Sequence, residues 1–242
     1  MNVQDTIGAM QRLKLTGMAR CYGAMVSQPL HEQPEAHLMM AMTMDAEGEY
    51  RALKRTQLYL SRSRLRYHAL PEHINCSVQR GITKEQLLIL CDGLYIDKAE
   101  NVLITGSTGS GKSFLACALG RQACLTGRRS IYYAMNRFIE SLSAARLDGS
   151  MLKWMNQIAK TPLLIIDDFG LKKMDTHARL ALLDILEDRY GKGATIITSQ
   201  LPVAQWHEYI GDPTLADAIL DRLIPHAHKL DLQGESLRGK KR

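Results

Sequence analysis

The stretch from Gly106 to Ser113 has the residue types and the spacing of a phosphate-binding loop. Its sequence, GSTGSGKS, fits the pattern GxxxxGK[ST], in which glycines let backbone N–H groups turn toward phosphate oxygens. In this pattern the Lys112 ammonium reaches the β- and γ-phosphates, and the Ser113 hydroxyl ligates Mg²⁺. We therefore predict ATP and Mg²⁺ as cofactors. The predicted ATP contacts are Gly106, Ser107, Thr108, Gly109, Ser110, Gly111, Lys112, Ser113 and Phe114.

Two adjacent carboxylates provide a candidate for the rest of the magnesium site. Asp167 and Asp168 directly follow the apolar run LLII at residues 163–166. Because side chains alternate along a strand, we predict that Asp167 joins the shell of Mg²⁺ and that Asp168 activates the attacking water. A pair of Asp residues that caps the next helix is the alternative, and the phosphate loop in the same chain favours the first interpretation.

Polar residues farther along the chain could complete such a site. Thr198 and Gln200 end another apolar run and could sense the γ-phosphate, although an ordinary turn is the alternative there. Arg222 could stabilise transition-state charge in a neighbouring subunit, but a surface salt bridge with a nearby acid explains it equally well. Arg238 has the same two interpretations.

The phosphate loop requires a strand before it and a helix after it, and the sequence supplies both. Apolar residues 102–104 precede the loop, and a helix-like stretch opens at Lys112. From residue 101 onward, short apolar runs alternate with amphipathic stretches, which indicates a parallel sheet with crossover helices. Ligands of such folds lie at the carboxyl ends of the strands. We therefore predict an α/β fold whose parallel sheet is flanked by helices.

The residues before this α/β region differ in composition. Up to residue 70 the chain is rich in Met, Leu, Ala and Gln and has almost no clusters of β-branched residues, as helices prefer. We predict a helical N-terminal domain over residues 1–70 that binds DNA or a partner, a connector over residues 71–100, and an ATPase domain over residues 101–242.

Basic residues gather near the end of the N-terminal region. Between Arg51 and Arg66 the chain has no acidic residue. On one continuous helix, several of these basic side chains would lie within about 60° of one another and form a stripe that suits phosphates. That stripe would consist of Arg51, Arg55, Arg62 and Arg66. A solvated helix face paired with acids such as Glu47 fits the charge pattern equally well. The predicted DNA contacts are Arg51, Lys54, Arg55, Arg62, Arg64 and Arg66.

Length and composition agree with a globular protein that has a small accessory domain. The 242 residues are 45% hydrophobic, and the formal net charge of +6 permits a polyanionic partner. No apolar run approaches the roughly 18 residues of a membrane span, and the N-terminus lacks the hydrophobic core of a signal peptide. We therefore predict no membrane association and a cytoplasmic location. The cysteines form no CxxC pair, which argues against a zinc site and a disulfide framework.

The order of these motifs resembles that of a known family. The segments NVLITGSTGSGKSFLACALG, LLIIDDFGL, RYGKGATIITSQLPVAQW, LADAILDRL and GESLR, with the N-terminal LKLTGMA, are similar to segments of the IstB-like ATPases. These bacterial proteins of the AAA+ class assist insertion-sequence transposases and are relatives of the DnaC-type helicase loaders. The resemblance covers most of the chain.

The resemblance implies a P-loop AAA+ domain preceded by a small all-helical N-terminal domain. The implied roles are ATP binding at residues 106–113, Mg²⁺ binding at Ser113 and Asp167, water activation at Asp168, a sensor-one-like contact at Gln200, an arginine finger across a subunit interface at Arg222, and a sensor-two-like contact at Arg238. AAA+ proteins usually have Glu in place of Asp168 and Asn in place of Gln200. Because each difference changes the reach of the side chain by a methylene, we expect slow ATP turnover that DNA or a partner regulates.

These expectations together describe a regulator of transposition. ATP bound between adjacent subunits would assemble a homo-oligomer on double-stranded DNA, and this assembly would recruit and stimulate a cognate transposase. A replicative helicase loader is the closest alternative, because the core motifs hardly separate the two. A small-molecule kinase is a more distant one, since it would need a phosphoacceptor pocket and an arginine-bearing lid that the region after Ser130 does not indicate.

Overall fold

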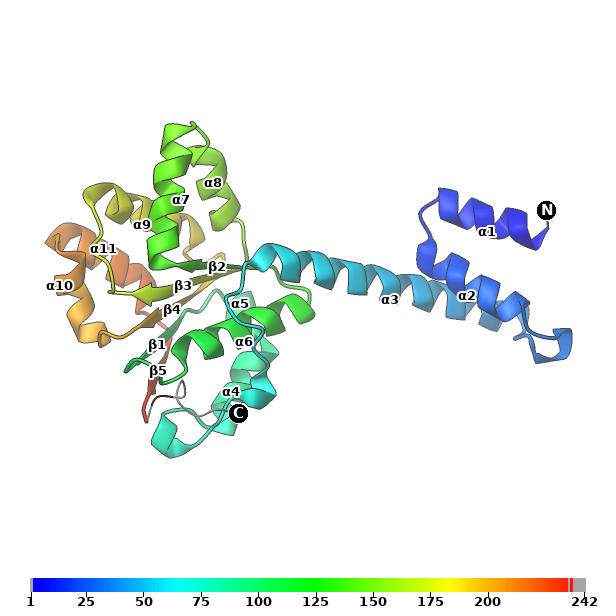
Figure 1. Ribbon diagram of the computed structural model, residues 1–242, viewed down its shortest axis with the longest axis horizontal. Helices are drawn as coiled ribbons and strands as arrows, with labels where there is room; N and C mark the ends of the chain where they lie inside the picture. Colours follow the sequence, from blue (N-terminus) through cyan, green and yellow to red (C-terminus); the bar gives the residue numbers. More distant parts are fainter. Residues whose placement is uncertain (1, 235, 237–242) are drawn as a thin grey trace. The chain divides into compact units, whose positions relative to one another are not determined.

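The chain forms two compact units, Met1–Leu58 and Tyr59–Arg242, and the boundary falls inside helix α3, Ala36–Ser63 (Figure 1). The computed structural model describes residues 2–234 and residue 236. The domain boundary that we predicted at residue 70 therefore lies within the second unit. Among the described residues, no helix is both long enough and apolar enough to cross a membrane.

The first unit consists of helices. They are α1 (Val3–Arg12), α2 (Thr16–Val26), the 3-10 helix η1 (Leu30–Glu32) and the N-terminal part of α3. Helix α1 begins with a capping box, in which the backbone N–H groups of Asn2 and Asp5 each donate to the side chain of the other residue. The helical N-terminal region predicted from composition is confirmed.

Helix α2 is held on α3 by a buried carboxylate. The N-terminus of α2 has no cap from the side chain before it, and Glu47 of α3 instead accepts hydrogen bonds from the N–H groups of Gly17 at 2.7 Å and Met18 at 3.2 Å. A Cβ atom on Gly17 would lie 2.4 Å from the carbonyl oxygen of Ala46, so glycine permits this close approach. Glu47 also forms an ion pair with Arg51 at 2.7 Å. The LKLTGMA segment therefore docks α2 onto α3.

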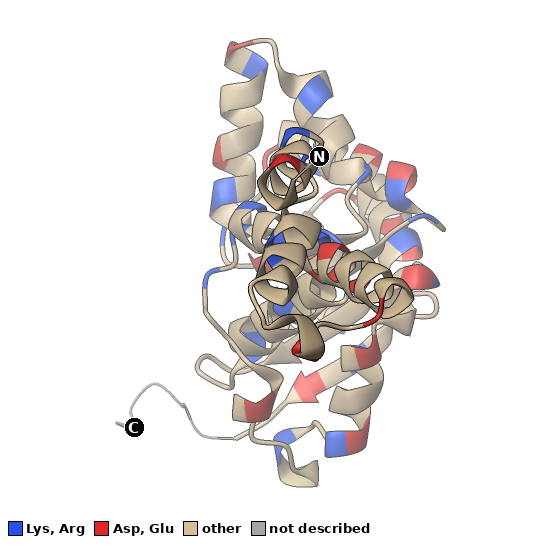
Figure 2. Ribbon diagram, turned by 90° about the vertical axis from the view of Figure 1, so that its right-hand side faces the viewer, with Lys and Arg blue, Asp and Glu red and all other residues tan. Residues whose placement is uncertain are grey.

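The basic stretch from Arg51 to Arg66 is not one continuous helix. Helix α3 ends at Ser63, and Arg64 has a φ of 57°, in the left-handed region where a right-handed helix cannot continue. The stripe that one continuous helix would form therefore does not include Arg66, which lies beyond the helix. Arg51 remains on the helix but pairs with Glu47. Figure 2 shows basic residues interspersed with acidic ones over the ribbon.

The second unit is built on a parallel sheet with the strand order β2-β3-β4-β1-β5. The strands are β1 (Val102–Gly106), β2 (Ser130–Ala134), β3 (Leu163–Phe169), β4 (Ala194–Ser199) and β5 (His228–Leu232). The central strands are rich in buried aliphatic residues because helices cover both faces of the sheet. The predicted α/β fold is confirmed, and the parallel direction brings the carboxyl ends of all strands to one edge.

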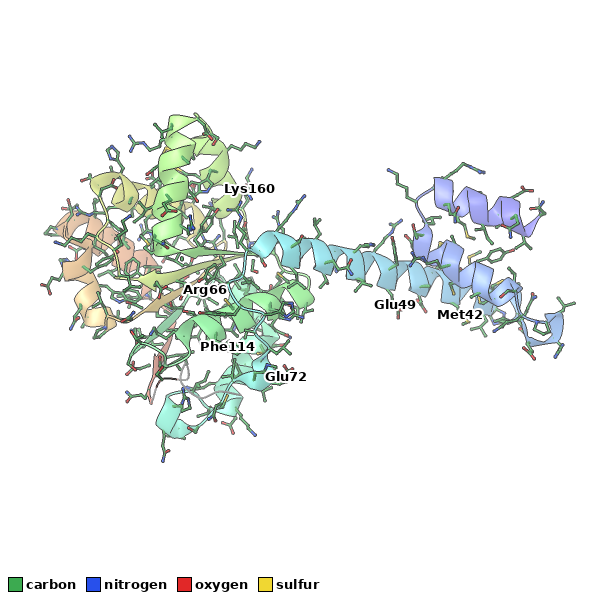
Figure 3. The ribbon with its side chains drawn as sticks, viewed as in Figure 1. Met42, Glu49, Arg66, Glu72, Phe114 and Lys160 are labelled. Atoms are coloured by element: carbon green, nitrogen blue, oxygen red, sulfur yellow. The ribbon has the colours of Figure 1, made fainter. Side chains whose placement is uncertain are left out.

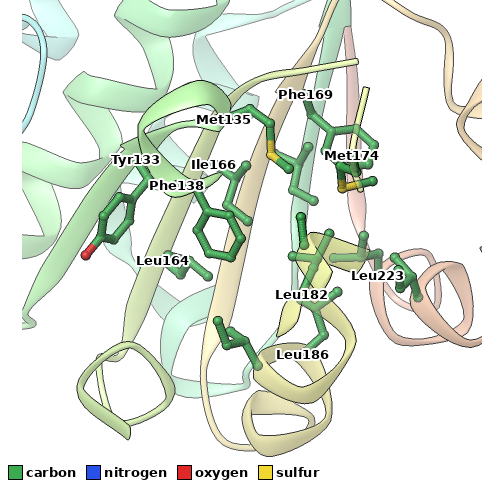
Figure 4. Packing of buried hydrophobic residues seen from close by; sticks show 14 of the residues in the cluster. Tyr133, Met135, Phe138, Leu164, Ile166, Phe169, Met174, Leu182, Leu186 and Leu223 are labelled. Atoms are coloured by element: carbon green, nitrogen blue, oxygen red, sulfur yellow. The ribbon is translucent and has the colours of Figure 1, made fainter. Parts of the chain in front are cut away.

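Helices from different parts of the sequence cover the two faces of this sheet (Figure 1). One face packs against α7 (Met135–Leu147), α8 (Met151–Ala159), α9 (Thr176–Arg189), α10 (Trp206–Ile210) and α11 (Pro213–Leu223), with the 3-10 helix η4 (Val203–Gln205) before α10. Its core includes the fully buried rings of Phe138 and Phe169 (Figure 4). The other face packs against α6 (Lys112–Leu125), whose Leu115 and Leu119 are fully buried as well.

Residues 71–100, which we predicted to be a connector, contribute to the apolar core on the face of the sheet that α6 covers. They form η2 (Pro71–His73), η3 (Val78–Arg80), α4 (Lys84–Asp92) and α5 (Leu94–Asp97). The side chains of Ile82, Leu90 and Ile96 are buried in the same apolar cluster as the residues of α6. The segment is therefore part of the second unit, because its apolar residues cover one face of the sheet.

Candidate nucleotide-binding site

The phosphate loop joins β1 to α6 in a conformation that depends on glycine. Gly106, Gly109 and Gly111 have φ angles of 139°, 84° and 102°, which residues with a side chain rarely adopt. At Gly106 a Cβ atom would also lie 2.1 Å from the carbonyl oxygen of Leu232 in β5. Helix α6 begins at Lys112, directly after the loop, so the predicted order of strand, loop and helix is confirmed.

The ammonium group of Lys112 is folded onto the loop. The residue is 6% exposed, and its Nζ donates to the carbonyl oxygens of Gly106 and Ser107, each at 2.7 Å. The Ser110 hydroxyl is buried and has no hydrogen-bond partner among the described residues. A phosphate group in the loop would offer acceptors to both groups. Phe114, on the helix that follows, is partly buried against the apolar core that includes the residues of α6.

Asp167 is the centre of a hydrogen-bond network that joins four elements. Its side chain is fully buried at the end of β3, and Oδ1 accepts from the hydroxyls of Ser113 at 2.8 Å and of Thr198. The other oxygen, Oδ2, accepts from the Tyr132 hydroxyl at 2.5 Å. Burial and the hydrogen bond to Asp167 raise the pKa of Tyr132, so this phenol remains a donor. The network fixes the carboxylate next to the start of α6.

The contact between Ser113 and Asp167 suits a magnesium ion. A hydroxyl and a carboxylate provide hard oxygen ligands, and Mg²⁺ is usually held by one or two protein groups together with phosphate oxygens and water. Within the described part of the chain, no group of three or more His, Cys, Asp or Glu side chains could hold a metal. The hydroxyl of Ser113 and the carboxylate of Asp167 fit an ion that also binds phosphate oxygens of the nucleotide, and they would hold Mg²⁺ on the protein side.

The surroundings of the next acid, Asp168, differ from those of Asp167 because the backbone of β3 is irregular at this point. The register of β3 against β4 shifts between Ile166 and Phe169, and within this irregularity Asp168 has a φ of 62°. Its backbone N–H donates to the Thr198 hydroxyl at 3.1 Å, and its side chain is 29% exposed. The acid that we predicted to activate water is therefore more accessible than Asp167.

Arg66, which is labelled in Figure 3, contacts both acids, and the sequence did not indicate this contact. Its Nη1 lies 3.3 Å from Oδ2 of Asp168 and 3.8 Å from Oδ2 of Asp167. Burial opposes the guanidinium charge, but two neighbouring tyrosines and Asp168 outweigh this effect and raise the pKa of Arg66. The chain positions of Arg66 and Asp168 are 102 apart, so only tertiary structure brings them together. A residue predicted to contact DNA thus lies beside the two acids of the nucleotide site.

The two candidates for a γ-phosphate sensor contact different parts of the site. The Gln200 side-chain oxygen accepts a hydrogen bond from the Thr108 hydroxyl of the loop at 2.7 Å. Thr198, two residues earlier, instead donates to Asp167. Both therefore lie beside groups that we predicted to hold the nucleotide and its metal.

Two further segments approach the loop from outside. Arg80 of η3 donates to the carbonyl oxygen of Ser110 at 3.1 Å, a contact without any sequence motif because its acceptor is a backbone atom. Ser236 comes so close that a Cβ atom on Gly109 would lie 2.2 Å from its hydroxyl oxygen. Arg238, the predicted sensor-two-like residue, lies outside the described residues.

The predicted DNA contacts are divided between the two units. Arg51, Lys54 and Arg55 belong to the first unit, and Arg62, Arg64 and Arg66 belong to the second. Arg55 and Arg62 are exposed on α3. The Arg64 guanidinium lies 5.8 Å from the ring centroid of Tyr133 on β2. The role of these residues in DNA binding stays a prediction.

Arg222 lies at the amino ends of the strands, on the side of the sheet away from the phosphate loop. Its carbonyl oxygen accepts a 2.9 Å hydrogen bond from the side-chain amide of Asn101, the residue before β1. Its guanidinium lies 3.0 Å from Glu187, also pairs with Asp221, and is 4.9 Å from the ring centroid of Tyr190. A pocket of about 280 Å³ opens beside it. The ion pair that we weighed as the alternative is present, and Arg222 does not approach the loop of its own subunit.

The arrangement of loop and acid defines the class of the protein. The phosphate loop follows β1, the buried Asp167 lies near the carboxyl end of β3, and β4 lies between these two strands with polar residues at its carboxyl end. A parallel sheet that presents these groups at one edge is the framework of the P-loop nucleoside triphosphatases.

Comparison with known proteins gives the family. The family described as "IstB-like ATP binding protein" matches residues 8–242. The chain is 41% identical to the putative insertion sequence ATP-binding protein y4pL of Sinorhizobium fredii, over 100% of this chain and 99% of that protein. It is 35% identical to the putative ATP-binding protein of insertion sequence IS1162 of Pseudomonas fluorescens, over 84% of this chain and 88% of that protein. The chain therefore belongs to the IstB-like ATP-binding proteins, and the resemblance seen in its motifs is confirmed.

Solved structures support the same fold. The DnaC helicase loader superimposes with a TM-score of 0.56 at 19% identity, over 69% of this chain and 98% of that chain. DnaI superimposes with a TM-score of 0.59 at 18% identity, over 71% of this chain and 91% of that chain. At such identities the similarity concerns the fold alone. Together with the family, it confirms the predicted AAA+ fold and the ATPase class.

Proposed function

We propose that this chain is an ATP-dependent regulator of transposition that assembles as a homo-oligomer on double-stranded DNA and recruits a cognate transposase. The family supports ATP binding, and the relatives at 41% and 35% identity are named for insertion sequences. The observation that carries the proposal is the position of Arg222 relative to the phosphate loop.

Arg222 and the loop lie at opposite ends of β1. Asn101, whose amide binds the Arg222 carbonyl, precedes this strand, and Gly106 ends it. At about 3.3 Å per residue, the strand spans roughly 15 Å, which is more than an arginine side chain can bridge. An Arg222 that contacts ATP would therefore contact the ATP of an adjacent subunit. Each nucleotide would then be shared by two copies of the chain, and assembly would depend on it.

Hydrolysis at such a site needs a fixed nucleotide and an activated water molecule. We assign the first task to Lys112, Ser113 and Asp167, which would hold the phosphates and Mg²⁺. When bound, the metal would neutralise charge on the phosphate oxygens. Asp168 would accept a proton from the water that attacks the γ-phosphorus, and the products would be ADP and phosphate.

Two further side chains would make hydrolysis responsive to assembly. Gln200 contacts Thr108 of the loop and would respond to the γ-phosphate. Arg222 of the neighbouring subunit would add positive charge after leaving its present partner Glu187. Because Asp168 is one methylene shorter than the Glu usual in AAA+ proteins and is paired with Arg66, we expect slow turnover.

DNA binding is assigned to the basic residues of α3 and of the segment that follows it. The exposed Arg55 and Arg62 are the best placed to meet backbone phosphates. Arg51 would contribute less, because it pairs with Glu47. In this assignment residues 1–58 bind DNA or a partner protein, and residues 59–242 form the ATPase domain.

The proposal is tested by measuring oligomer size and duplex DNA binding of the full chain with ATP and with ADP. We expect larger assemblies and tighter binding with ATP. Lys112→Ala should lose this dependence on ATP, whereas Lys153→Ala on the exposed face of α8 should keep it. Equal oligomer size and equal DNA affinity in the two nucleotides would contradict the proposal.

The choice of partner separates this function from that of a helicase loader. The names of the relatives favour an insertion-sequence system, while the 19% identity to the helicase loader concerns only the fold. A pull-down with the full chain, using a cognate transposase and a replicative helicase as preys, compares the two directly. Retention of the helicase alone would replace our proposal by the loader function.

A further inference from the structure

A hollow of about 610 Å³ lies beside Asp168, at the carboxyl ends of β2 and β3. The basic residues that line it are Arg64, Arg66, Arg137 and Lys172. They come from the segment after α3, from the start of α7 and from the segment after β3. Among the described residues that line the hollow, Asp168 alone is acidic. The hollow therefore carries an excess of positive charge and suits an anion.

The basic side chains of this pocket are accessible from solvent. The Arg66 side chain is 44% exposed, and that of Arg137 is 75% exposed in its surface pair with Glu140. Lys172 is exposed as well. Ion pairs with this degree of exposure contribute little and exchange readily. A ligand with phosphate oxygens could therefore bind these cations without first opening the fold.

We propose that this pocket binds a backbone phosphate of duplex DNA and that the phosphate replaces Asp168 as the partner of Arg66. This inference rests on the proposed function, because it takes Asp168 as the acceptor of the proton from water. Arg66 now lies 3.3 Å from Oδ2 of Asp168 and occupies one of the two oxygens that could accept that proton. DNA binding would free this oxygen, so hydrolysis would be faster after assembly on DNA.

The arrangement of the chain favours a DNA phosphate over a small anion. Arg62, Arg64 and Arg66 alternate along one segment without an acid between them, so basic groups continue from the pocket onto α3. A polyanion can contact several such groups at once, whereas a single free anion contacts few. The arginine fork is also suited to two parallel hydrogen bonds with a phosphate.

The first test measures ATP hydrolysis by the full chain with and without duplex DNA. Wild-type protein should be stimulated by DNA. Arg66→Gln should raise the rate without DNA by up to about fivefold, as expected when a partly exposed ion pair is released, and should bring the stimulation ratio close to one. If Arg66→Gln keeps both the basal rate and the stimulation ratio of the wild type, the inference is wrong.

The second test removes the phosphate contacts and leaves Arg66 in place. The double variant Arg137→Ala with Lys172→Ala should lower the salt dependence of DNA binding, by up to about one unit of slope for each lost contact. The matched control is Arg146→Ala with Lys153→Ala, which removes the same charge from exposed positions on α7 and α8. Equal slopes for the two double variants would overturn the assignment of the pocket to DNA.

Two further measurements separate this inference from the proposed function. Asp168→Asn tests the role of Asp168, so loss of hydrolysis in that variant with normal stimulation in Arg66→Gln would refute only the switch. Sodium sulfate without DNA tests for a free-anion site. If sulfate stimulates wild-type hydrolysis as strongly as DNA does, the pocket accepts small anions and the DNA assignment fails.

Discussion

The hydroxyl of Ser113, in the first turn of α6, donates a 2.8 Å hydrogen bond to Oδ1 of Asp167 at the end of β3, although the two residues are 54 positions apart. The bond links the phosphate loop to the buried acid through the two oxygens best suited to Mg²⁺. The two side chains should therefore act as one unit in metal and nucleotide binding.

Ser113→Ala and Asp167→Asn should each raise the Mg²⁺ concentration needed for half-maximal ATP binding, by about tenfold or more. The double variant should be little worse than the worse single variant, because each change disables the same unit. Nucleotide affinity measured over a range of Mg²⁺ concentrations tests this. Ser143→Ala on α7 is the control, since its hydroxyl donates to the carbonyl oxygen of Ile139 in its own helix. Additive effects of Ser113 and Asp167 would show that they act separately.

If each active site combines residues of two subunits, mixing two inactive variants should restore ATP hydrolysis. Arg222→Ala should reduce ATP hydrolysis by about a thousandfold if the residue is an arginine finger, and Asp168→Asn should also be inactive. A mixture of the two should regain activity, because one subunit supplies the intact loop with Asp168 and its neighbour supplies Arg222. Protein that carries both substitutions in the same chain should stay inactive on its own. No recovery in the mixture would exclude a contact across subunits.

Two glycines of the first unit should respond to alanine with opposite signs. Gly17→Ala should destabilise the packing of α2 on α3 by about 1–3 kcal/mol, because the added Cβ would meet the Ala46 carbonyl oxygen at 2.4 Å. Gly48→Ala should stabilise α3 by about 0.5–1 kcal/mol, since nothing lies within 4 Å of its Cβ position and alanine favours helix. Amide hydrogen exchange in α2 and α3 measures both effects. A stabilising Gly17→Ala would mean that the two helices are not in close contact.

The first unit should become less stable at low pH because Glu47 becomes protonated. Burial opposes the charge of this carboxylate, but the hydrogen bonds from Arg51 and from the N–H groups of α2 outweigh burial and lower the pKa of Glu47. A carboxyl whose pKa is lower in the folded protein than in the unfolded chain stabilises the fold when the pH is above its pKa in the unfolded chain. This contribution is lost as the pH falls from that value through the pKa in the folded protein. Unfolding of α2 should therefore become easier below pH 4.5, the ordinary pKa of a glutamate.

Glu47→Gln should make hydrogen exchange in α2 less dependent on pH over this range. Glu49→Gln is the matched control, because it removes an exposed carboxyl from the same helix. If the two variants have the same pH profile, the cap on α2 does not depend on the charge of Glu47.

The sequence predicted those parts of the fold that are encoded locally. The loop from Gly106 to Ser113 and the run before Asp167 carry their signal within a few residues, and strands alternating with helices suffice for a parallel sheet. The order of the strands and the cover provided by residues 71–100 depend on contacts between distant segments. Short apolar stretches such as that around Leu90 gave no indication of which face they would cover.

The parts of the site that could not be predicted also depend on tertiary contacts or on single backbone angles. Helix α3 ends before Arg64 without a glycine or proline to signal it, and this ending turns Arg66 toward Asp168. The register shift in β3 gives Asp168 its own surroundings, and strand alternation alone does not describe them. Arg80 contacts a backbone carbonyl, which leaves no complementary residue type in the sequence to find.

The burial of residues 71–100 has a practical consequence for dividing the chain. A fragment that starts at residue 101, where the motifs begin, would lose the side chains of Ile82, Leu90 and Ile96 and would leave apolar surface of α6 in water. Such a fragment should aggregate. A fragment that starts at Tyr59 keeps this cover and should be the shorter form that can be expressed and crystallised.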